Sequence, residues 1–311
     1  MTEIGSKTFT KARLLFRLAR PHFLVTGIML YTLGALLAIV NGAIVELTVL
    51  VFGYAIFLFS HISMHFSNDY FDQEGDRLSQ RTPMSGGSGV LVEHPEMAHL
   101  ALMVAVLLLA ASMVTATVFT LYYSYPPSFL IFAVLGALLG WFYNAPPLRL
   151  AYRGLGEIST VIAVGLVMPG MGYFVASGTI DVWFMILALP LFCYGLFFIV
   201  TVEMPDIESD RLAGRENLLL DHGLEIGTKV ALFATVLATA LLISIAYSGV
   251  LGSTIDIWPL VFFSLIPLTI ATYGAVRDLR QRNKVLSQVK LNFSSLIGLV
   301  LVFIGIAATT S

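Results

Sequence analysis

Cysteine and charge are both scarce in this chain of 311 residues. The one cysteine, Cys193, has no partner for an internal disulfide, so nothing in the sequence argues for an oxidising compartment. Charged residues make up 12% of the chain, whereas a soluble domain needs roughly 25% to cover its surface. The sequence also lacks a basic domain that could follow a phosphate backbone, which argues against nucleic acid as a partner.

Hydrophobic residues make up 58% of the chain and gather in long runs. A membrane-spanning helix needs about 20 apolar residues, and the strict alternation typical of strands is missing. The sequence therefore predicts an all-α polytopic membrane protein with about nine transmembrane helices, rather than a β-barrel. The predicted spans are His22–Ala43, Val49–Phe66, Ala98–Tyr122, Ser128–Tyr143, Ile158–Ala176, Val182–Val202, Val230–Tyr247, Ile257–Tyr273 and Leu291–Ala308.

The basic residues all lie on one side of this plan. All 17 lysines and arginines precede the first span or follow the second, fourth, sixth or eighth, and the opposite loops carry only acidic charges. The positive-inside rule then places the N-terminus in the cytoplasm. We expect a single transmembrane domain over residues 1–311, with a cytoplasmic N-terminal segment over 1–21 and cytoplasmic loops over 67–97 and 203–229. Because no signal or transit peptide is evident, the expected location is a prokaryotic cytoplasmic membrane.

Two acidic clusters directly follow spans two and six, reading NDYFDQEGD and EMPDIESD. If each helix continues beyond the membrane, Asn68, Asp72 and Asp76 share one face, as do Asp206 and Asp210. Like charges at this spacing repel each other, which indicates a missing counter-charge. Mg²⁺ would supply that charge, because it binds carboxylates together with substrate phosphates. Two such rows could hold a diphosphate between metal ions.

Each cluster alone is also compatible with solvated loop acids. Two clusters with the same D-x-x-x-D spacing, on the same side of the membrane, favour a shared site. The Gly/Ser-rich stretch over 81–89 is either a flexible connector or a loop that approaches an anion. Arg149 and Arg153 are either topological anchors or ligands of diphosphate oxygens. His61 and His65 lack a carboxylate that would complete a zinc site, so His61 either packs between helices or lines an acceptor pocket.

The segment from Asn68 to Asp76 matches N-D-x-x-D-x-x-x-D, and that from Asp206 to Asp210 matches D-x-x-x-D. With both motifs in cytoplasmic loops of a nine-span chain, the sequence resembles the UbiA superfamily of intramembrane prenyltransferases over essentially its whole length. Arg20-Pro21 resembles the family's usual entry to the first span. The resemblance implies helices bundled around a central cavity, with 67–97 and 203–229 as active-site loops.

The resemblance also implies Mg²⁺-dependent transfer of a polyprenyl group from a polyprenyl diphosphate to an aromatic acceptor at the cytoplasmic side. The implied metal ligands are Asn68, Asp72, Asp76, Asp206 and Asp210, and the four aspartates among them are the catalytic residues. The expected substrate-binding residues are Asn68, Asp69, Arg77, Tyr143, Arg149, Arg153, Glu203 and Arg211.

The SGGS loop and the YRGLGE string are most similar to the menaquinone branch, which prenylates 1,4-dihydroxy-2-naphthoate. Glu203-Met204-Pro205 departs from the Asn-rich string common in that branch. The acceptor therefore stays open among 1,4-dihydroxy-2-naphthoate, 4-hydroxybenzoate, homogentisate, haem and archaeal geranylgeranylglyceryl phosphate. A cation-coupled transporter and an assembly protein are more distant alternatives, and the near absence of ionisable residues within the spans argues against transport.

Overall fold

The computed structural model describes residues 3–82 and 85–310, and every regular element in them is helical. Residues 1–2 of the predicted N-terminal segment and 83–84 of the predicted loop over 67–97 lie outside the described part. In chain order the elements are α1 (Glu3–Leu18), α2 (Pro21–Val40), α3 (Leu47–Phe71), α4 (Gln73–Leu78), α5 (Val90–Glu93), η1 (Pro95–Met97), α6 (Ala98–Tyr122), α7 (Pro127–Trp141), η2 (Leu150–Tyr152), α8 (Gly156–Ile162), the π-helical turn η3 (Ala163–Val167), α9 (Met168–Ser177), α10 (Val182–Glu203), α11 (Ile207–Leu212), α12 (Leu218–Ser248), α13 (Trp258–Val276) and α14 (Arg282–Thr310).

Eight helical stretches in the described residues are long and apolar enough to cross a membrane, with α8, η3 and α9 forming one of them. The ninth predicted span, Ser128–Tyr143, corresponds to α7, which is apolar but has only 15 residues. At 1.5 Å per residue α7 rises ~22 Å, less than the ~30 Å hydrocarbon core. The all-α membrane class is confirmed, whereas the count of nine and the cytoplasmic N-terminus stay predictions.

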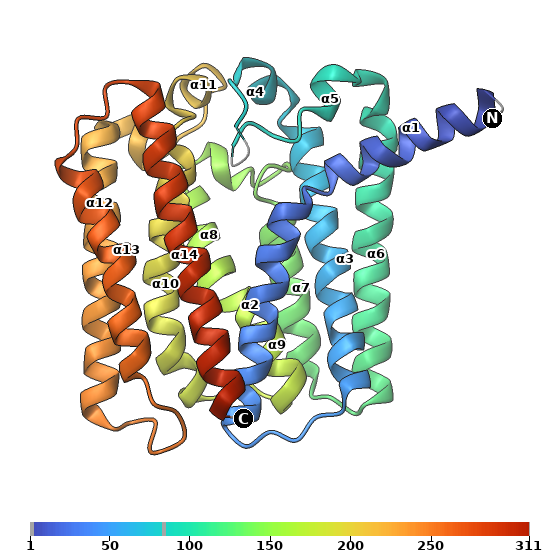
Figure 1. Ribbon diagram of the computed structural model, residues 1–311. Coiled ribbons are helices and arrows are strands. Elements are labelled where there is room, and N and C mark those ends of the chain that lie inside the picture. Colours follow the sequence, from blue (N-terminus) through green and yellow to red (C-terminus); the bar gives the residue numbers. More distant parts are fainter. Residues whose placement is uncertain (1–2, 83–84, 311) are drawn as a thin grey trace.

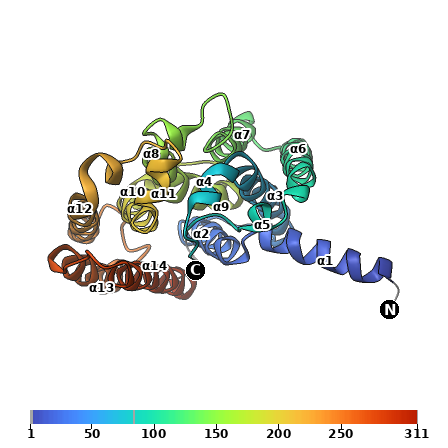
Figure 2. The same cartoon turned by 90° about the horizontal axis from the view of Figure 1, so that it is seen from above.

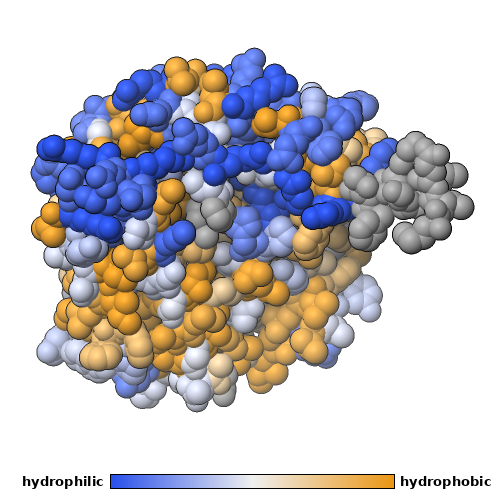
Figure 3. Space-filling view, turned by 45° about the horizontal axis from the view of Figure 1, so that its top comes forward, coloured by the Kyte–Doolittle hydropathy of each residue, from blue (hydrophilic) through white to orange (hydrophobic). Residues whose placement is uncertain are grey.

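Hydrophobic side chains cover the flank of the bundle, and hydrophilic ones gather at one end. Figure 3 shows this division, with the hydrophilic end turned toward the viewer. Large apolar side chains such as Leu107, Leu135 and Phe262 are exposed on the outside of the helices. Within lipid only helices and closed barrels satisfy every backbone polar group internally, so this surface suits a helical membrane protein.

The helices form two packed groups that meet where α14 packs on α2 and where α10 packs on α8 and η3. In the first, α2 packs on α9, and α3 packs on α6 and α7; in the second, α10, α12, α13 and α14 follow one another. Figure 2 shows these helices arranged around a central region, where α14 lies beside α2 and joins the two groups.

Glycines permit the close crossing of α2 and α9. A Cβ atom at Gly34 would overlap the backbone carbonyl of Pro169, and one at Gly172 would overlap that of Tyr31. Small residues commonly let membrane helices approach this closely, since packing rather than water exclusion holds them together. Gly34 and Gly172 therefore allow α2 to pack directly against α9, on one side of the central region.

The two acidic segments lie at the same end of the bundle. Figures 1 and 2 both place α4 beside α11. Figure 1 shows α1 reaching outward at that end and the C-terminus at the other end. Arg282, the first residue of α14, donates hydrogen bonds to the carbonyls of Gln80 (2.7 Å) and Pro205 (3.1 Å). One guanidinium group therefore ties together the segments that follow α4 and α10.

The continuous helices considered for the aspartate rows are not observed. α3 ends at Phe71 and α10 at Glu203, and both rows continue on the short helices α4 and α11. Pro205 explains the second break because it has no N–H to donate. The helical spacing survives the bends: the N–H of Asp76 donates to the carbonyl of Asp72 at 2.9 Å, and that of Asp210 to Asp206 at 2.8 Å.

We expect Gly34→Ala to destabilise the protein by about 1–3 kcal/mol, because the added methyl group forces α2 away from α9. Gly305→Ala on α14 is the matched control, since its methyl group would meet no atom within 4 Å, and a helical alanine is if anything favoured over glycine. Thermal unfolding in detergent measures both variants. Equal midpoints for the two would contradict the proposed role of the close crossing.

Candidate active site

A cavity of about 300 Å³ lies among the helices beneath α4 and α11. Carboxylates and arginines line it near these short helices, and side chains such as Leu30, Val300 and Phe303 line it farther along the bundle. The cavity thus joins a charged region to an apolar one. The predicted site residues that line it are Asn68, Asp72, Asp76, Tyr143, Glu203, Asp206 and Asp210.

Asp72 occupies the junction between α3 and α4 and is 6% exposed. Its carboxylate accepts hydrogen bonds from the Tyr152 hydroxyl and from the Arg215 guanidinium, with which it also forms an ion pair. Asp76, one turn further on α4, lies against the backbone of Gly87, where a Cβ would overlap its carboxylate. Gly87 also has a φ of +68°, which favours glycine. The glycine-rich loop therefore closes directly over the first aspartate row.

The second row is held by neighbours on two other segments. Ser79 donates a hydrogen bond to Asp206 at 3.3 Å, which links the end of α4 to α11. The side-chain amide of Asn217 donates to Asp210 at 3.1 Å, and its Oδ1 atom caps α12 by accepting from the N–H of Leu220 at 2.9 Å. The start of α12 therefore sets the position of Asp210.

Arg215 joins the two rows. It pairs with Asp72, and its other terminal nitrogen lies 3.5 Å from Asp210. Burial lowers the pKa of the Arg215 guanidinium, but Asp72 and Asp210 outweigh this effect and hold it above its ordinary value. The cation therefore stays charged between two carboxylates from distant parts of the sequence.

Negative charge is nevertheless in excess. Among the described residues, five acidic side chains and two arginines line the cavity, and one of these arginines, Arg20, is already paired with Asp69. Burial, reinforced by Asp69 and Asp72, raises the pKa of Asp76 to about 8. Burial also raises the pKa of Asp210 to about 6, although Arg215 opposes the shift. A raised pKa means that the ionised carboxylate is disfavoured at this position, so binding of a positive charge nearby would be favourable.

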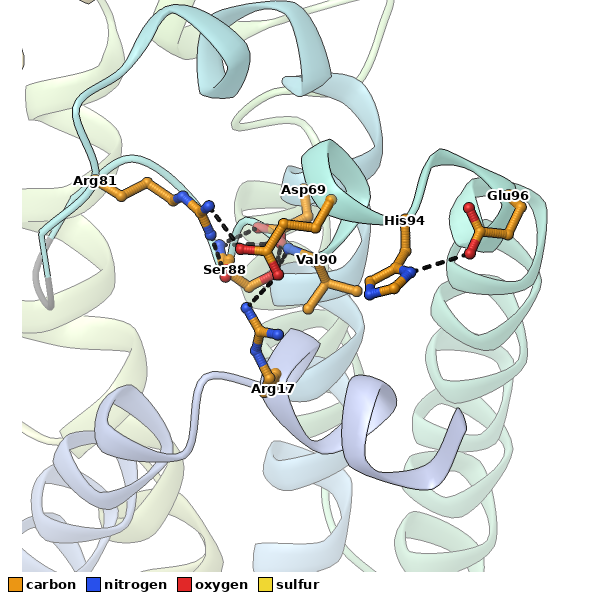
Figure 4. Close-up of polar contacts among 8 residues, drawn as sticks. Arg17, Asp69, Arg81, Ser88, Val90, His94 and Glu96 are labelled. Carbon is orange, nitrogen blue, oxygen red and sulfur yellow. Dashed lines mark hydrogen bonds and ion pairs between the residues drawn. The ribbon is translucent and has the colours of Figure 1, made fainter. Parts of the chain in front are cut away.

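Asp69 adds to this negative charge but does not itself line the cavity. Its carboxylate is 1% exposed and binds Arg20 and the hydroxyl and N–H of Ser88, the latter at 3.1 Å. Figure 4 shows Ser88 beside Asp69. Arg81 and Arg17 form ion pairs with Glu93 at 2.8 and 3.0 Å. In the structure Asp69 fastens the glycine-rich loop to α3 and Arg20, and its role in substrate binding stays a prediction.

The structure does not bring four predicted substrate-binding arginines into the cavity. Arg77, Arg149, Arg153 and Arg211 are exposed and are absent from its lining. Arg149 stacks 3.9 Å above the Tyr152 ring, and Arg153 donates to the carbonyl of Pro147 at 3.0 Å. Their roles as diphosphate ligands stay predictions without a contact to support them.

Sequence reasoning did not assign Arg20 and Arg215, which line the cavity, or Tyr152, which binds Asp72, to the site. Arg20 was visible only as the residue before Pro21, and Arg215 only as one of the basic residues that set the topology. Tyr152 belongs to the YRGLGE string, which was used for its resemblance. Neither spacing nor residue type separates Arg215 from the exposed Arg211, so the sequence offers no signal that could have found it.

The donor set fits a hard divalent cation that is shared with a substrate. Among the described residues, no three His, Cys, Asp or Glu side chains converge as a complete metal site. Each row instead offers carboxylates, and Asn68 adds a buried amide oxygen that has no hydrogen-bond partner. Magnesium is typically held by one or two carboxylates, water and substrate phosphates. The arrangement thus suits Mg²⁺ that binds together with a phosphorylated ligand.

Residues 28–297 match the UbiA prenyltransferase family. The chain belongs to this family. It is therefore a prenyltransferase of the membrane-embedded type. A curated relative, the 1,4-dihydroxy-2-naphthoate octaprenyltransferase of Bacillus subtilis (strain 168), is 25% identical over 286 residues, which cover 88% of this chain and 86% of the relative.

Solved structures share the fold. A UbiA homolog from Archaeoglobus fulgidus bound to GPP and Mg²⁺ superposes with a TM-score of 0.68 at 18% identity, covering 96% of this chain and 99% of that one. A structure described for digeranylgeranylglyceryl phosphate synthase gives 0.66 at 18% identity, with the same coverage. At this identity the likeness establishes the architecture of the prenyltransferase and leaves its acceptor open.

We expect Arg215→Gln to lower the rate of prenyl transfer about 100-fold, as removal of a preorganised charged donor does elsewhere. The substitution leaves Asp72 and Asp210 without their shared counter-charge. Arg280→Gln is the control, because that side chain is 93% exposed and lies outside the cavity. A rate for Arg215→Gln within about threefold of wild type, in a variant with normal thermal stability, would contradict the role given to Arg215.

Proposed function

We propose that this prenyltransferase carries out Mg²⁺-dependent transfer of a polyprenyl group from a polyprenyl diphosphate to an aromatic acceptor. The observation that carries the proposal is the meeting of two aspartate rows at the head of a cavity that continues between apolar side chains. A polyprenyl diphosphate has the same division, with an anionic head and an apolar tail. The excess of carboxylates requires a cation before a diphosphate can approach, which supports the metal dependence.

We assign the head of the cavity to the diphosphate. Asn68, Asp72, Asp76, Asp206 and Asp210 would hold the metal ions, which supply electrostatic stabilisation of the leaving diphosphate when bound. Arg20 and Arg215 lie beside these carboxylates and can donate hydrogen bonds to diphosphate oxygens.

The reaction itself breaks the allylic C–O bond, and the diphosphate leaves with the electron pair. A carbon of the electron-rich acceptor ring then forms the new C–C bond. The surrounding helices exclude water, which would otherwise capture the allylic cation. The apolar lining accommodates the isoprenoid chain close to the reacting carbon, and the remainder extends along the helices.

We propose 1,4-dihydroxy-2-naphthoate as the acceptor, in the synthesis of menaquinone. The similarity to the Bacillus subtilis octaprenyltransferase over 88% of the chain supports this choice. Substitution on that ring releases the carboxylate as carbon dioxide. A second candidate acceptor is archaeal geranylgeranylglyceryl phosphate. It is supported by the structure described for digeranylgeranylglyceryl phosphate synthase, which shares the fold of this chain. That acceptor would bring a second phosphate into an already acidic region.

We expect Asp72→Ala and Asp206→Ala each to reduce turnover by at least about 100-fold, because each removes a carboxylate from one row. Folding should persist, since the hydrophobic cores do not include these side chains. Turnover of radiolabelled donor and the thermal midpoint are measured on the same preparations. Near-normal activity in either variant would overturn the assignment of two metal-binding rows.

Product analysis by mass spectrometry tests the reaction and the acceptor together. The purified chain in lipid receives Mg²⁺, geranylgeranyl diphosphate and either 1,4-dihydroxy-2-naphthoate, 4-hydroxybenzoate, homogentisate, haem or geranylgeranylglyceryl phosphate. We expect a prenylated, decarboxylated naphthoquinol that disappears with EDTA and returns with added Mg²⁺. Product on another acceptor would retain the chemistry and reject the naphthoate, and full activity in EDTA would reject the metal.

A further inference from the structure

Two histidines on α3 line the cavity below the aspartate rows. His61 and His65 are 6% and 4% exposed, and both belong to the cavity lining. Nδ1 of His61 and Nε2 of His65 are fully buried and have no hydrogen-bond partner in the described part of the chain. Eleven buried side-chain polar atoms in the described residues lack a partner, and eight of them belong to residues that line this one cavity.

The histidines follow the first aspartate row along one face of α3. His61, His65 and Asn68 are spaced at i, i+4 and i+7, which places them on the same side of the helix. At 1.5 Å per residue, His65 lies about 4.5 Å below Asn68 along the helix axis and His61 about 10.5 Å below it. The pair therefore lies next to the diphosphate region, where a donor's reactive carbon and its acceptor have to meet.

Packing fixes both rings. Phe57, His61, His65 and Phe23 form a continuous series with successive ring centroids 5.2, 4.8 and 5.9 Å apart. Gly27 on α2 leaves room for the His61 ring, since a Cβ there would overlap its Cε1 and Nδ1 atoms. The imidazoles are thus held in place before any ligand binds, which limits the entropy lost on binding.

The chemistry of the two rings identifies the kind of ligand. A neutral imidazole carries one N–H donor and one acceptor nitrogen. Nδ1 of His61, which lies against Gly27, and Nε2 of His65 are closed off by packing, so a ligand in the cavity meets the opposite nitrogen of each ring. An isoprenoid tail has no polar group below its diphosphate and would leave that nitrogen unpaired at a cost in free energy. An aromatic acceptor with ring hydroxyls can pair with it and also pack flat against the neighbouring rings.

We propose that His61 and His65 bind the hydroxyl groups of the aromatic acceptor and thereby set its ring beside the reactive carbon of the donor. The inference rests on the proposed function and extends it to the acceptor half of the site. A hydroxyl that donates to an imidazole nitrogen also becomes more electron-rich, which favours attack by the ring on an allylic cation.

The test separates acceptor binding from donor binding in the full chain. Variants His61→Leu, His65→Leu and Gly27→Ala are compared with His99→Leu on α6, an exposed histidine outside the cavity, and with Gly305→Ala. Equilibrium dialysis measures binding of 1,4-dihydroxy-2-naphthoate without donor, and steady-state kinetics give KM for acceptor and for geranylgeranyl diphosphate. His61→Gln and His65→Asn, which keep a polar group, serve as rescue variants.

We expect each Leu variant to weaken acceptor binding about tenfold, as loss of one buried hydrogen bond does. KM for the donor should stay within about twofold, and the polar replacements should recover part of the affinity. Gly27→Ala should act like His61→Leu because it displaces the same ring.

Two results would count against the inference in different ways. Unchanged acceptor affinity in both Leu variants, in a wild-type background that prenylates the naphthoate, overturns the histidine assignment alone. Equal weakening for donor and acceptor, or a matching fall in thermal midpoint, also overturns it, because the histidines would then be structural. A wild-type enzyme that transfers prenyl groups only to the glycerol phosphate acceptor overturns the proposed function and this inference together.

Discussion

Compensation of buried negative charge is the constraint on which the rest of the site depends. Carboxylates from α3 and α4 meet those from α10 and α11 away from bulk water, where an unpaired charge is costly. Arg215 offsets part of that cost by pairing with Asp72 and Asp210, and it thereby joins the two halves of the bundle. A metal cation would neutralise the remaining negative charge, and a diphosphate needs the same cation in order to bind. The same carboxylates therefore determine both the stability of the folded site and its affinity for the donor.

Several residues outside the two aspartate rows hold the site carboxylates in position. Arg282 fastens the segments after α4 and α10 through their carbonyls, and Asn217 caps α12 while it holds Asp210. Asp69 anchors the glycine-rich loop through Ser88, so that Gly87 lies on Asp76. Each of these residues holds a segment that carries or contacts one of the site carboxylates. A site of this kind tolerates change in its apolar lining more readily than loss of one polar anchor.

The sequence predicted the fold class and the aspartate rows because both are local patterns. Apolar runs of membrane length define the spans, and the i, i+4 spacing survives the bends after α3 and α10. The arginines could not be predicted in this way. Arg211 lies in the last turn of α11 and Arg215 just beyond it, and the turn that ends α11 directs Arg215 inward and leaves Arg211 exposed. The end of α7 before Tyr143 was likewise missed, since the apolar composition continues past the last helical residue.

The distribution of unpaired polar atoms divides the cavity by chemistry. Near α4 and α11 the groups are carboxylates, arginines and the Asn68 amide; one to two turns below on α3 they are imidazoles; farther in, the lining is largely apolar. A ligand that satisfies all three zones must combine an anion with metal ions, a hydroxylated ring and a hydrocarbon chain. No single small molecule in a simple transport reaction has this combination, whereas a polyprenyl diphosphate and an aromatic acceptor have it between them. The order of the zones also places the bond to be broken beside the ring that attacks.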